Sequence, residues 1–129
     1  LYIEANGLLS LGQIEQAEIH FKQSELLAKT NKDWLYFAYS QSMLGKIAQH
    51  QDKFGKALNR FNSALQYQEL LNCPMGVAQG HLDLAELYLS NNNVPKATEN
   101  FIIAKELISE RSLIQVKPLL AHVEGQLNK

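Results

Sequence analysis

The side chains that most often carry out chemistry, namely histidines, cysteines and paired carboxylates, are widely scattered in this sequence. A zinc site needs ligands that converge to about 2 to 2.3 Å from the metal, usually from tight pairs such as C-x2-C or H-x3-H. The histidines lie far apart along the chain, with no two in such a pair: His20, His50, His81 and His122. We therefore predict structural or surface histidines and no metal site, although the last two could approach each other on successive helices.

The sequence shows no signature of nucleophilic catalysis either. Cys73 lies directly before Pro74 and has no base nearby in the sequence that would favour its thiolate. No G-x-S-x-G turn is present, and the glycines of residues 76–80 lack the Lys-Ser/Thr of a phosphate loop. The carboxylates have the helical spacing of solvent-exposed faces: Glu15, Glu18, Glu86 and Glu106. We predict a protein that is not an enzyme and holds no cofactor.

Composition and charge argue against several further classes of protein. The chain has 129 residues, of which 46% are hydrophobic, and 12 basic side chains balance 13 acidic ones. This is enough for one domain with a continuous core and argues against intrinsic disorder. The near-neutral charge argues against nucleic acid as a partner, and no apolar run approaches the roughly 18 to 20 residues of a membrane span. One cysteine suits a reducing compartment, so we expect a cytoplasmic protein, and a first residue other than Met suggests a piece of a longer chain.

The elements that must position any functional side chain are helices, because leucine and alanine dominate and small and aromatic residues recur every 40 positions. Alanine, phenylalanine and a small residue at i, i+4 and i+7 form one helix stripe, and a second small residue on the partner helix lets the two helices approach closely. We call a set of residues spaced 40 positions apart a column. The three columns of this stripe are Ala17, Ala57 and Ala97, then Phe21, Phe61 and Phe101, then Ser24, Ala64 and Ala104. The partner column is Ala5, Gly45, Ala85 and Gly125.

This pattern predicts antiparallel helix hairpins with helices near 1–10, 14–30, 34–49, 54–71, 75–90, 94–109 and 113–128. Within the hairpin turns, Gly12, Asp52 and Asn92 are residue types that tolerate a left-handed backbone. We expect Asn93 to cap the following helix, with Pro95 in its first turn.

These residues resemble the tetratricopeptide repeat family over nearly the whole chain. Its first-helix pattern is matched by His81, Leu84, Ala85 and Tyr88, and in part by Gln41, Leu44, Gly45 and Ala48. Its second-helix pattern of Ala, Phe and Ala is matched in all three copies. The unit is longer than the family's usual one and lacks the closing proline. In its length it is similar to the 40-residue-repeat variety in helical modules of bacterial regulators and cell-polarity adaptors.

The resemblance implies a single all-α domain over 1–129, a right-handed α-solenoid of three hairpins and a terminal half unit. The units are expected at about 1–32, 33–72 and 73–112, with the last helix at about 113–129. In this architecture the first helices line a concave groove that would bind a peptide or protein segment. Counting from the small residues gives the predicted groove: Tyr2, Asn6, Tyr39, Ser42, Lys46, Gln49, Gln79, Leu82, Glu86, Leu89, His122 and Gln126. Lys46 and Glu86 are expected to face each other across neighbouring units.

Three alternatives stay open from the sequence. The groove stripe is interpreted equally simply as a solvated helix face, and the chain as a sensory or linker domain of a larger bacterial signalling or transcription-regulatory protein. Self-association through the last helix competes with a capping role for its apolar residues Ile114, Val116, Leu119, Leu120, Val123 and Leu127.

An aromatic run, Trp34 to Tyr39, opens one first helix. It could form a ligand platform, but packing is favoured. We expect Trp34 and Phe37 to pack around Leu26, Leu27 and Thr30, which leaves Tyr39 as the most exposed member.

Overall fold

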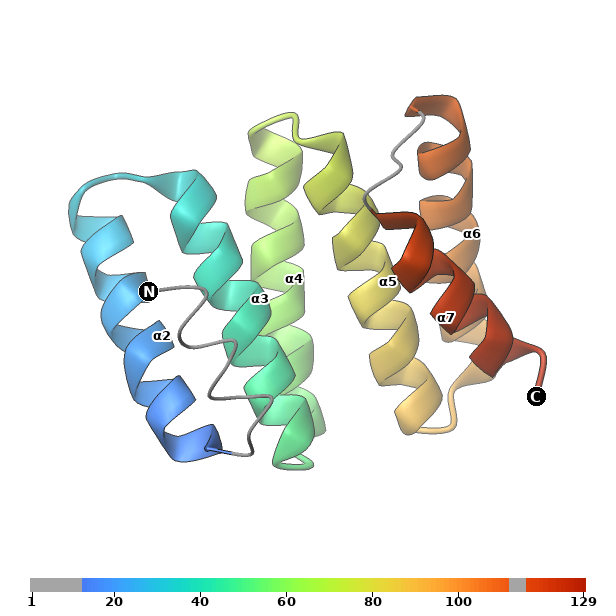
Figure 1. Ribbon diagram of the computed structural model, residues 1–129, viewed down its shortest axis with the longest axis horizontal. Coiled ribbons are helices and arrows are strands. Elements are labelled where there is room, and N and C mark those ends of the chain that lie inside the picture. Colours follow the sequence, from blue (N-terminus) through green and yellow to red (C-terminus); the bar gives the residue numbers. More distant parts are fainter. Residues whose placement is uncertain (1–12, 112–115) are drawn as a thin grey trace. The chain divides into compact units, whose positions relative to one another are not determined.

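The computed structural model describes residues 13–111 and 116–129, and in these residues all regular secondary structure is helical (Figure 1). The helices are α2 (Ile14–Thr30), α3 (Trp34–His50), α4 (Phe54–Leu70), α5 (Pro74–Ser90), α6 (Val94–Arg111) and α7 (Lys117–Leu127). The all-α prediction is confirmed, and the predicted bounds of α2 to α6 agree with the structure to within two residues. The helix predicted near 1–10, with Ala5 and Gly12, lies outside the described residues. None of the described helices is long and apolar enough to cross a lipid bilayer.

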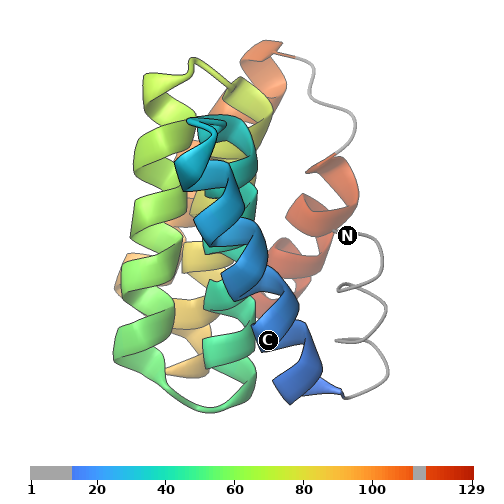
Figure 2. The ribbon, with the colours of Figure 1, turned by 90° about the vertical axis from the view of Figure 1, so that its left-hand side faces the viewer.

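The chain divides into two compact units, Leu1–Tyr67 and Gln68–Lys129, which we call the N-terminal and C-terminal units. In the N-terminal unit α2 packs beside α3, as both views of the ribbon show (Figures 1 and 2). In the C-terminal unit α5 packs on α6, and α7 packs on both. Consecutive helices therefore pair as the predicted hairpins require.

The predicted columns of small and aromatic residues form the core. Ala17, Ala57 and Ala97 are each completely buried. The phenylalanines four positions later are 1%, 1% and 7% exposed, and the next column is also buried: Ser24, Ala64 and Ala104. The periodic stripe thus packs inward in all three second helices, which confirms the interpretation of the repeat.

The partner column is buried at Gly45 and Ala85 but not at Gly125, where the prediction is wrong. Gly125 is exposed, and a Cβ built on it would meet nothing within 4 Å. The physical reason is that α7 turns Val116 and Val123, on another of its sides, toward α5 and α6. In the described residues no second helix follows α7 to cover its Gly125 side.

The core of the C-terminal unit includes the apolar side of α7. Val116 and Val123 are buried in one cluster with residues of α5 and α6, and Leu119, Leu120 and Leu127 pack on that cluster partly buried. Much of the apolar surface that suggested self-association is therefore used within the unit. Ile114 lies outside the described residues.

The turns between helices repeat one left-handed geometry. The residues with positive φ are spaced every 20 positions: Lys32, Asp52, Asn72 and Asn92, at φ of 56°, 57°, 52° and 60°. In each turn the next residue donates its N–H to the carbonyl five positions back, as Asp33 does to Ala28 at 2.8 Å, which is the Schellman way of closing a helix. Asp52 and Asn92 confirm the prediction, whereas Lys32 and Asn72, in the other turns, were not predicted.

Helix starts follow local chemistry. Asn93 Oδ1 accepts the N–H of Lys96 at 3.3 Å, which confirms the predicted cap of α6. Asp33 Oδ1 accepts the N–H of Tyr36 in the same way at 3.2 Å and fixes the start of α3. These caps satisfy backbone N–H groups in the first turns of α3 and α6.

Candidate binding surfaces

One outer face of α3 carries four polar or aromatic side chains that remain partly accessible. Tyr39, Ser42, Lys46 and Gln49 are half-buried, whereas most other residues in the second half of this helix are buried. Their spacing of three or four residues places them along one line of the helix. We call these four residues the α3 strip.

Lys46 is the charged member of the α3 strip. Lys46 is half-buried as a residue and makes no ion pair within the described residues of the N-terminal unit. A lysine with no carboxylate partner in the described part of its own unit is available to pair with an anionic group of a partner. Ser42 and Gln49 add hydrogen-bonding groups on the same line.

A partly buried polar network holds α3 in place from its other side. The carboxylate of Glu25 on α2 accepts hydrogen bonds from Gln41 Nε2 on α3 and from Arg60 Nη1 on α4. Arg60 Nη1 also donates to Gln41 Oε1 at 3.0 Å. Three helices of the N-terminal unit are therefore tied together by one arginine, which fixes the orientation of the α3 strip. No sequence signal marks this network, because its members share no column.

On α5 the predicted groove residues divide into two groups. Gln79, Glu86 and Leu89 are half-buried, as a surface role requires. Leu82 is completely buried in a cluster that includes Phe101 of α6 and Val123 of α7. The prediction that Leu82 lines a groove is therefore wrong, because helices α6 and α7 close over this position.

The remaining predicted positions lie on α7 or outside the described residues. His122 is exposed, Gln126 is half-buried, and Tyr2 and Asn6 fall among the residues that are not described. His122 Nε2 lies 3.4 Å from Glu86 Oε2, so Glu86 contacts α7 within the C-terminal unit. The histidine is more exposed than the glutamate, and solvent screening makes this pair a weak contribution to stability.

His81 has a role that the sequence did not suggest. Its Nδ1 lies 2.9 Å from Asn100 Oδ1, and Asn100 Nδ2 donates to the carbonyl of Lys96 at 3.0 Å. Because the amide nitrogen of Asn100 is engaged there, its oxygen faces the ring, and the Nδ1–H of His81 is the donor. This histidine joins α5 to α6.

The aromatic run at the start of α3 packs on α4. The ring of Trp34 stacks on that of Tyr67 at 5.5 Å and 17°, and Phe37 meets Tyr67 edge-on at 5.0 Å. The predicted packing around Leu26 and Leu27 is wrong, since these residues are 67% and 61% exposed. The end of α4 supplies a flat aromatic ring, which stabilises the cluster better than aliphatic side chains would. The prediction that Tyr39 is the most exposed member of the run is also wrong: it is half-buried, whereas Leu35 is exposed.

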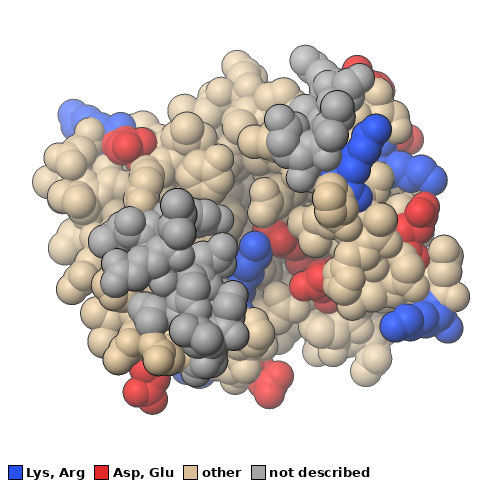
Figure 3. Space-filling model, viewed as in Figure 1, with Lys and Arg blue, Asp and Glu red and all other residues tan. Residues whose placement is uncertain are grey.

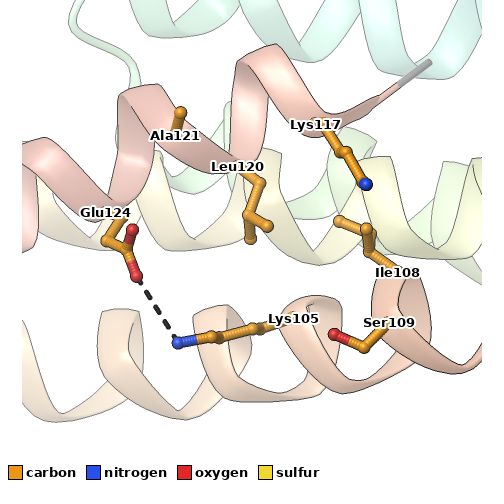
Figure 4. A pocket seen from close by; sticks show the side chains of 7 residues that line it. All are labelled: Lys105, Ile108, Ser109, Lys117, Leu120, Ala121 and Glu124. Carbon is orange, nitrogen blue, oxygen red and sulfur yellow. Dashed lines mark hydrogen bonds and ion pairs between the residues drawn. The ribbon is translucent and has the colours of Figure 1, made fainter. Parts of the chain in front are cut away.

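A hollow of about 300 Å³ lies between α6 and α7 in the C-terminal unit (Figure 4). Ile108 and Leu120 point into it, and the ion pair between Lys105 Nζ and Glu124 Oε2, at 3.5 Å, spans one end. We call it the α6–α7 groove, lined by Lys105, Ile108, Ser109, Lys117, Leu120, Ala121 and Glu124. The sequence analysis did not find it, although the repeat columns contain a signal for it.

No group of three or more His, Cys, Asp and Glu side chains in the described residues could hold a metal ion. Cys73 is a free, half-buried thiol. Over the described part of the face in Figure 3, acidic and basic side chains are interspersed among large uncharged areas.

Comparison with known proteins places this chain in no established group. No protein-family model matches it, and the search of curated proteins found no match. The function proposed for it therefore rests on the repeat and the α3 strip.

Proposed function

We propose that this protein is a non-catalytic interaction module that binds a peptide or protein segment on the outer face of its first helices. The observation that carries the proposal is that Lys46 is half-buried and makes no ion pair within the described residues of the N-terminal unit. Ser42, Gln49 and Tyr39 lie along the same face. A segment with a carboxylate for Lys46 and polar groups for its neighbours fits this chemistry.

The proposal includes the finer fold class expected from the sequence, a right-handed α-solenoid of tetratricopeptide-like hairpins. It is supported by the burial of the small and aromatic columns and by left-handed turns that recur at a constant spacing. The proposed location is the cytoplasm, in keeping with the free thiol of Cys73. The binding role does not need either point.

The α3 strip is suited to recognition because its support is rigid. The network of Glu25, Gln41 and Arg60 holds one side of α3, and the stacked rings of Trp34 and Tyr67 hold its start. A preorganised helix face loses little conformational entropy on binding, so more of the contact energy contributes to affinity.

Selection of peptides from a random library on the immobilised protein tests the proposal. We expect the enriched peptides to carry Asp or Glu and to lose about tenfold or more in affinity for Lys46→Glu, since that substitution replaces attraction by repulsion. The matched control is Lys56→Glu, which makes the same charge change at an exposed lysine of α4. Enriched peptides that bind the wild type and Lys46→Glu equally well would contradict the proposal, as would a selection that enriches none.

A further inference from the structure

The N-terminal unit shows how a second helix is seated in this fold. Helix α4 lies on α2 and α3, and four positions of those helices contact it directly: Glu25, Phe37, Gln41 and Gly45. Arg60 of α4 binds the first and the third, Tyr67 packs on the second, and Phe61 packs on the fourth. These contacts define the seat of a second helix by residue position.

The positions that correspond to these four residues, two 40-residue repeats later in the sequence, lie on α6 and α7. They are Lys105, Lys117, Ala121 and Gly125. The first three line the α6–α7 groove, and the fourth is exposed, with open space where its Cβ would stand. The groove is therefore the seat of a second helix that the described residues leave empty.

The chemistry of this seat differs from that of the N-terminal unit. Where α2 offers the carboxylate of Glu25, α6 offers the ammonium group of Lys105, and where α3 offers the ring of Phe37, α7 offers Lys117. Glu124 engages Lys105 at one end, so the groove keeps one excess positive charge, and Lys117 has no ion pair within the described residues. Apolar side chains lie between the two lysines (Figure 4). An occupant must therefore be amphipathic and acidic.

We propose that the α6–α7 groove binds an amphipathic helix of a partner protein that carries two acidic residues seven positions apart and a large apolar residue directly after the first. The first acidic residue takes the place that Arg60 has on α4 and faces Lys105. The apolar residue takes the place of Phe61 and packs on Gly125, and the second acidic residue takes the place of Tyr67 and faces Lys117. Helices that enter grooves in this way are read through such spaced anchors.

A second copy of this chain does not supply these residues. At the three positions its own second helices carry His-Phe-Leu (20, 21, 27), Arg-Phe-Tyr (60, 61, 67) and Asn-Phe-Leu (100, 101, 107). None of these sets contains a carboxylate, so charge complementarity favours a different protein. This surface is separate from the α3 strip, so the inference does not depend on the proposed function.

The test uses the whole protein and labelled peptides that copy α4. The acidic peptide has the sequence of Phe54–Leu70 with the substitutions R60E and Y67E, and the control peptide keeps Arg60 and carries Y67K. Fluorescence anisotropy measures both dissociation constants. Since two contacts change from repulsive to attractive, we expect the acidic peptide to bind about tenfold more tightly, and more so at low salt. Equal affinity of the two peptides would overturn the proposal.

Variants of the protein locate the bound peptide. Gly125→Leu fills the seat from a position where the structure has open space, so the fold is retained and binding of the acidic peptide is lost. Lys105→Glu together with Lys117→Glu reverses the preference between the peptides, whereas the matched control Lys56→Glu leaves it unchanged. Binding that survives Gly125→Leu but is lost in Lys46→Glu would place the peptide on the α3 strip and overturn the proposal.

Sedimentation velocity of the protein alone tests a second copy of this chain as the occupant. We expect the same sedimentation coefficient for the wild type and Gly125→Leu at all concentrations. A wild-type dimer that Gly125→Leu converts to a monomer would assign the groove to a second copy of this chain and overturn the proposal.

Discussion

The ring of Phe61 lies so close to Gly45 that a Cβ built on this glycine would stand 2.7 Å from two ring carbons. That distance is well inside van der Waals contact, so the absence of a side chain at Gly45 sets the separation of α3 and α4. In the C-terminal unit Ala85 and Phe101 occupy the same positions, and the ring there is 7% exposed instead of 1%. The methyl group of Ala85 thus goes with a slightly more exposed phenylalanine.

This contact predicts opposite effects for one substitution at two corresponding positions. Gly45→Ala gains about 1 kcal/mol of helix propensity but overpacks the ring of Phe61 by about 2 to 3 kcal/mol, which leaves a net loss of about 1 to 2 kcal/mol. Gly125→Ala gains roughly 0.5 to 1 kcal/mol, because its Cβ meets nothing within 4 Å. Urea unfolding of both variants measures the difference. Equal changes in the midpoint would show that Phe61 does not restrict Gly45.

The features that could be predicted from the sequence are those that recur. Alanine and phenylalanine columns set the buried stripe of each second helix, and Asp52 and Asn92 ended helices where expected, because these are local properties of residue type and spacing. Helix existence and bounds follow from such signals with little help from tertiary contacts.

The features that could not be predicted depend on which neighbour covers a face. Leu82 and Ser42 occupy the same position of the repeat, yet Leu82 is buried beneath α6 and α7 while Ser42 stays half-buried. Gly125 continues the column of Gly45 but loses its cover, because no second helix follows it in the described residues. A column gives the direction of a side chain, whereas burial depends on the next element.

Contacts between residues outside the columns could not be predicted from the sequence either. Trp34 stacks on Tyr67, far along the chain, and corresponding residues elsewhere in the chain are not aromatic, so no period marks the pair. The α6–α7 groove could not be predicted for the same reason. Its lining residues correspond to residues of α2 and α3 that contact α4, and only those contacts show what these positions do.

The left-handed turn at Lys32 offers a second prediction. A lysine pays a steric penalty at φ of 56°, whereas glycine adopts this backbone freely and closes a Schellman motif equally well. Lys32→Gly is expected to stabilise the protein by about 0.5 to 1 kcal/mol. Asn92→Gly, in the same geometry at φ of 60°, should gain less, because asparagine tolerates the left-handed region. Thermal unfolding compares the two variants; a larger gain at Asn92 than at Lys32 would contradict this account.

Gln68 and Gly76 form a third test, in the C-terminal unit. Gln68 is 3% exposed, and its buried Oε1 accepts no hydrogen bond from the described residues. A Cβ on Gly76 would lie 2.2 Å from that oxygen, so the glycine makes room for the amide. Gln68→Met keeps the length of the side chain and removes the unsatisfied carbonyl, and should stabilise by about 1 kcal/mol.

The reciprocal substitution provides the control for that test. Gly76→Ala should destabilise by about 1 to 2 kcal/mol, because the methyl group displaces a buried side chain. Combining it with Gln68→Ala removes the clash, so the two changes should be strongly non-additive in a double-mutant cycle. Additive effects would mean that Gln68 moves aside freely and that its burial does not depend on Gly76.

The hydrogen-bonded arginine of the N-terminal unit gives the last prediction. Arg60→Met keeps the apolar stem but removes the donor shared by Glu25 and buried Gln41, and we expect it to cost about 1 to 2 kcal/mol. The matched control is Lys22→Met, which breaks the i, i+4 pair with Glu18 on the exposed side of α2 and should cost less than about 0.5 kcal/mol.

Trp34 makes this comparison specific to one unit. It is the single tryptophan of the chain and lies in the N-terminal unit, so its fluorescence during urea unfolding follows the helices that Arg60 joins. Because the network is partly buried and the control pair is solvent-exposed, added salt, about 0.5 M NaCl, should weaken the effect of Lys22→Met more than that of Arg60→Met. Equal losses for the two variants, with equal salt dependence, would show that Arg60 contributes no more than a surface charge and that the α3 strip is held by apolar packing.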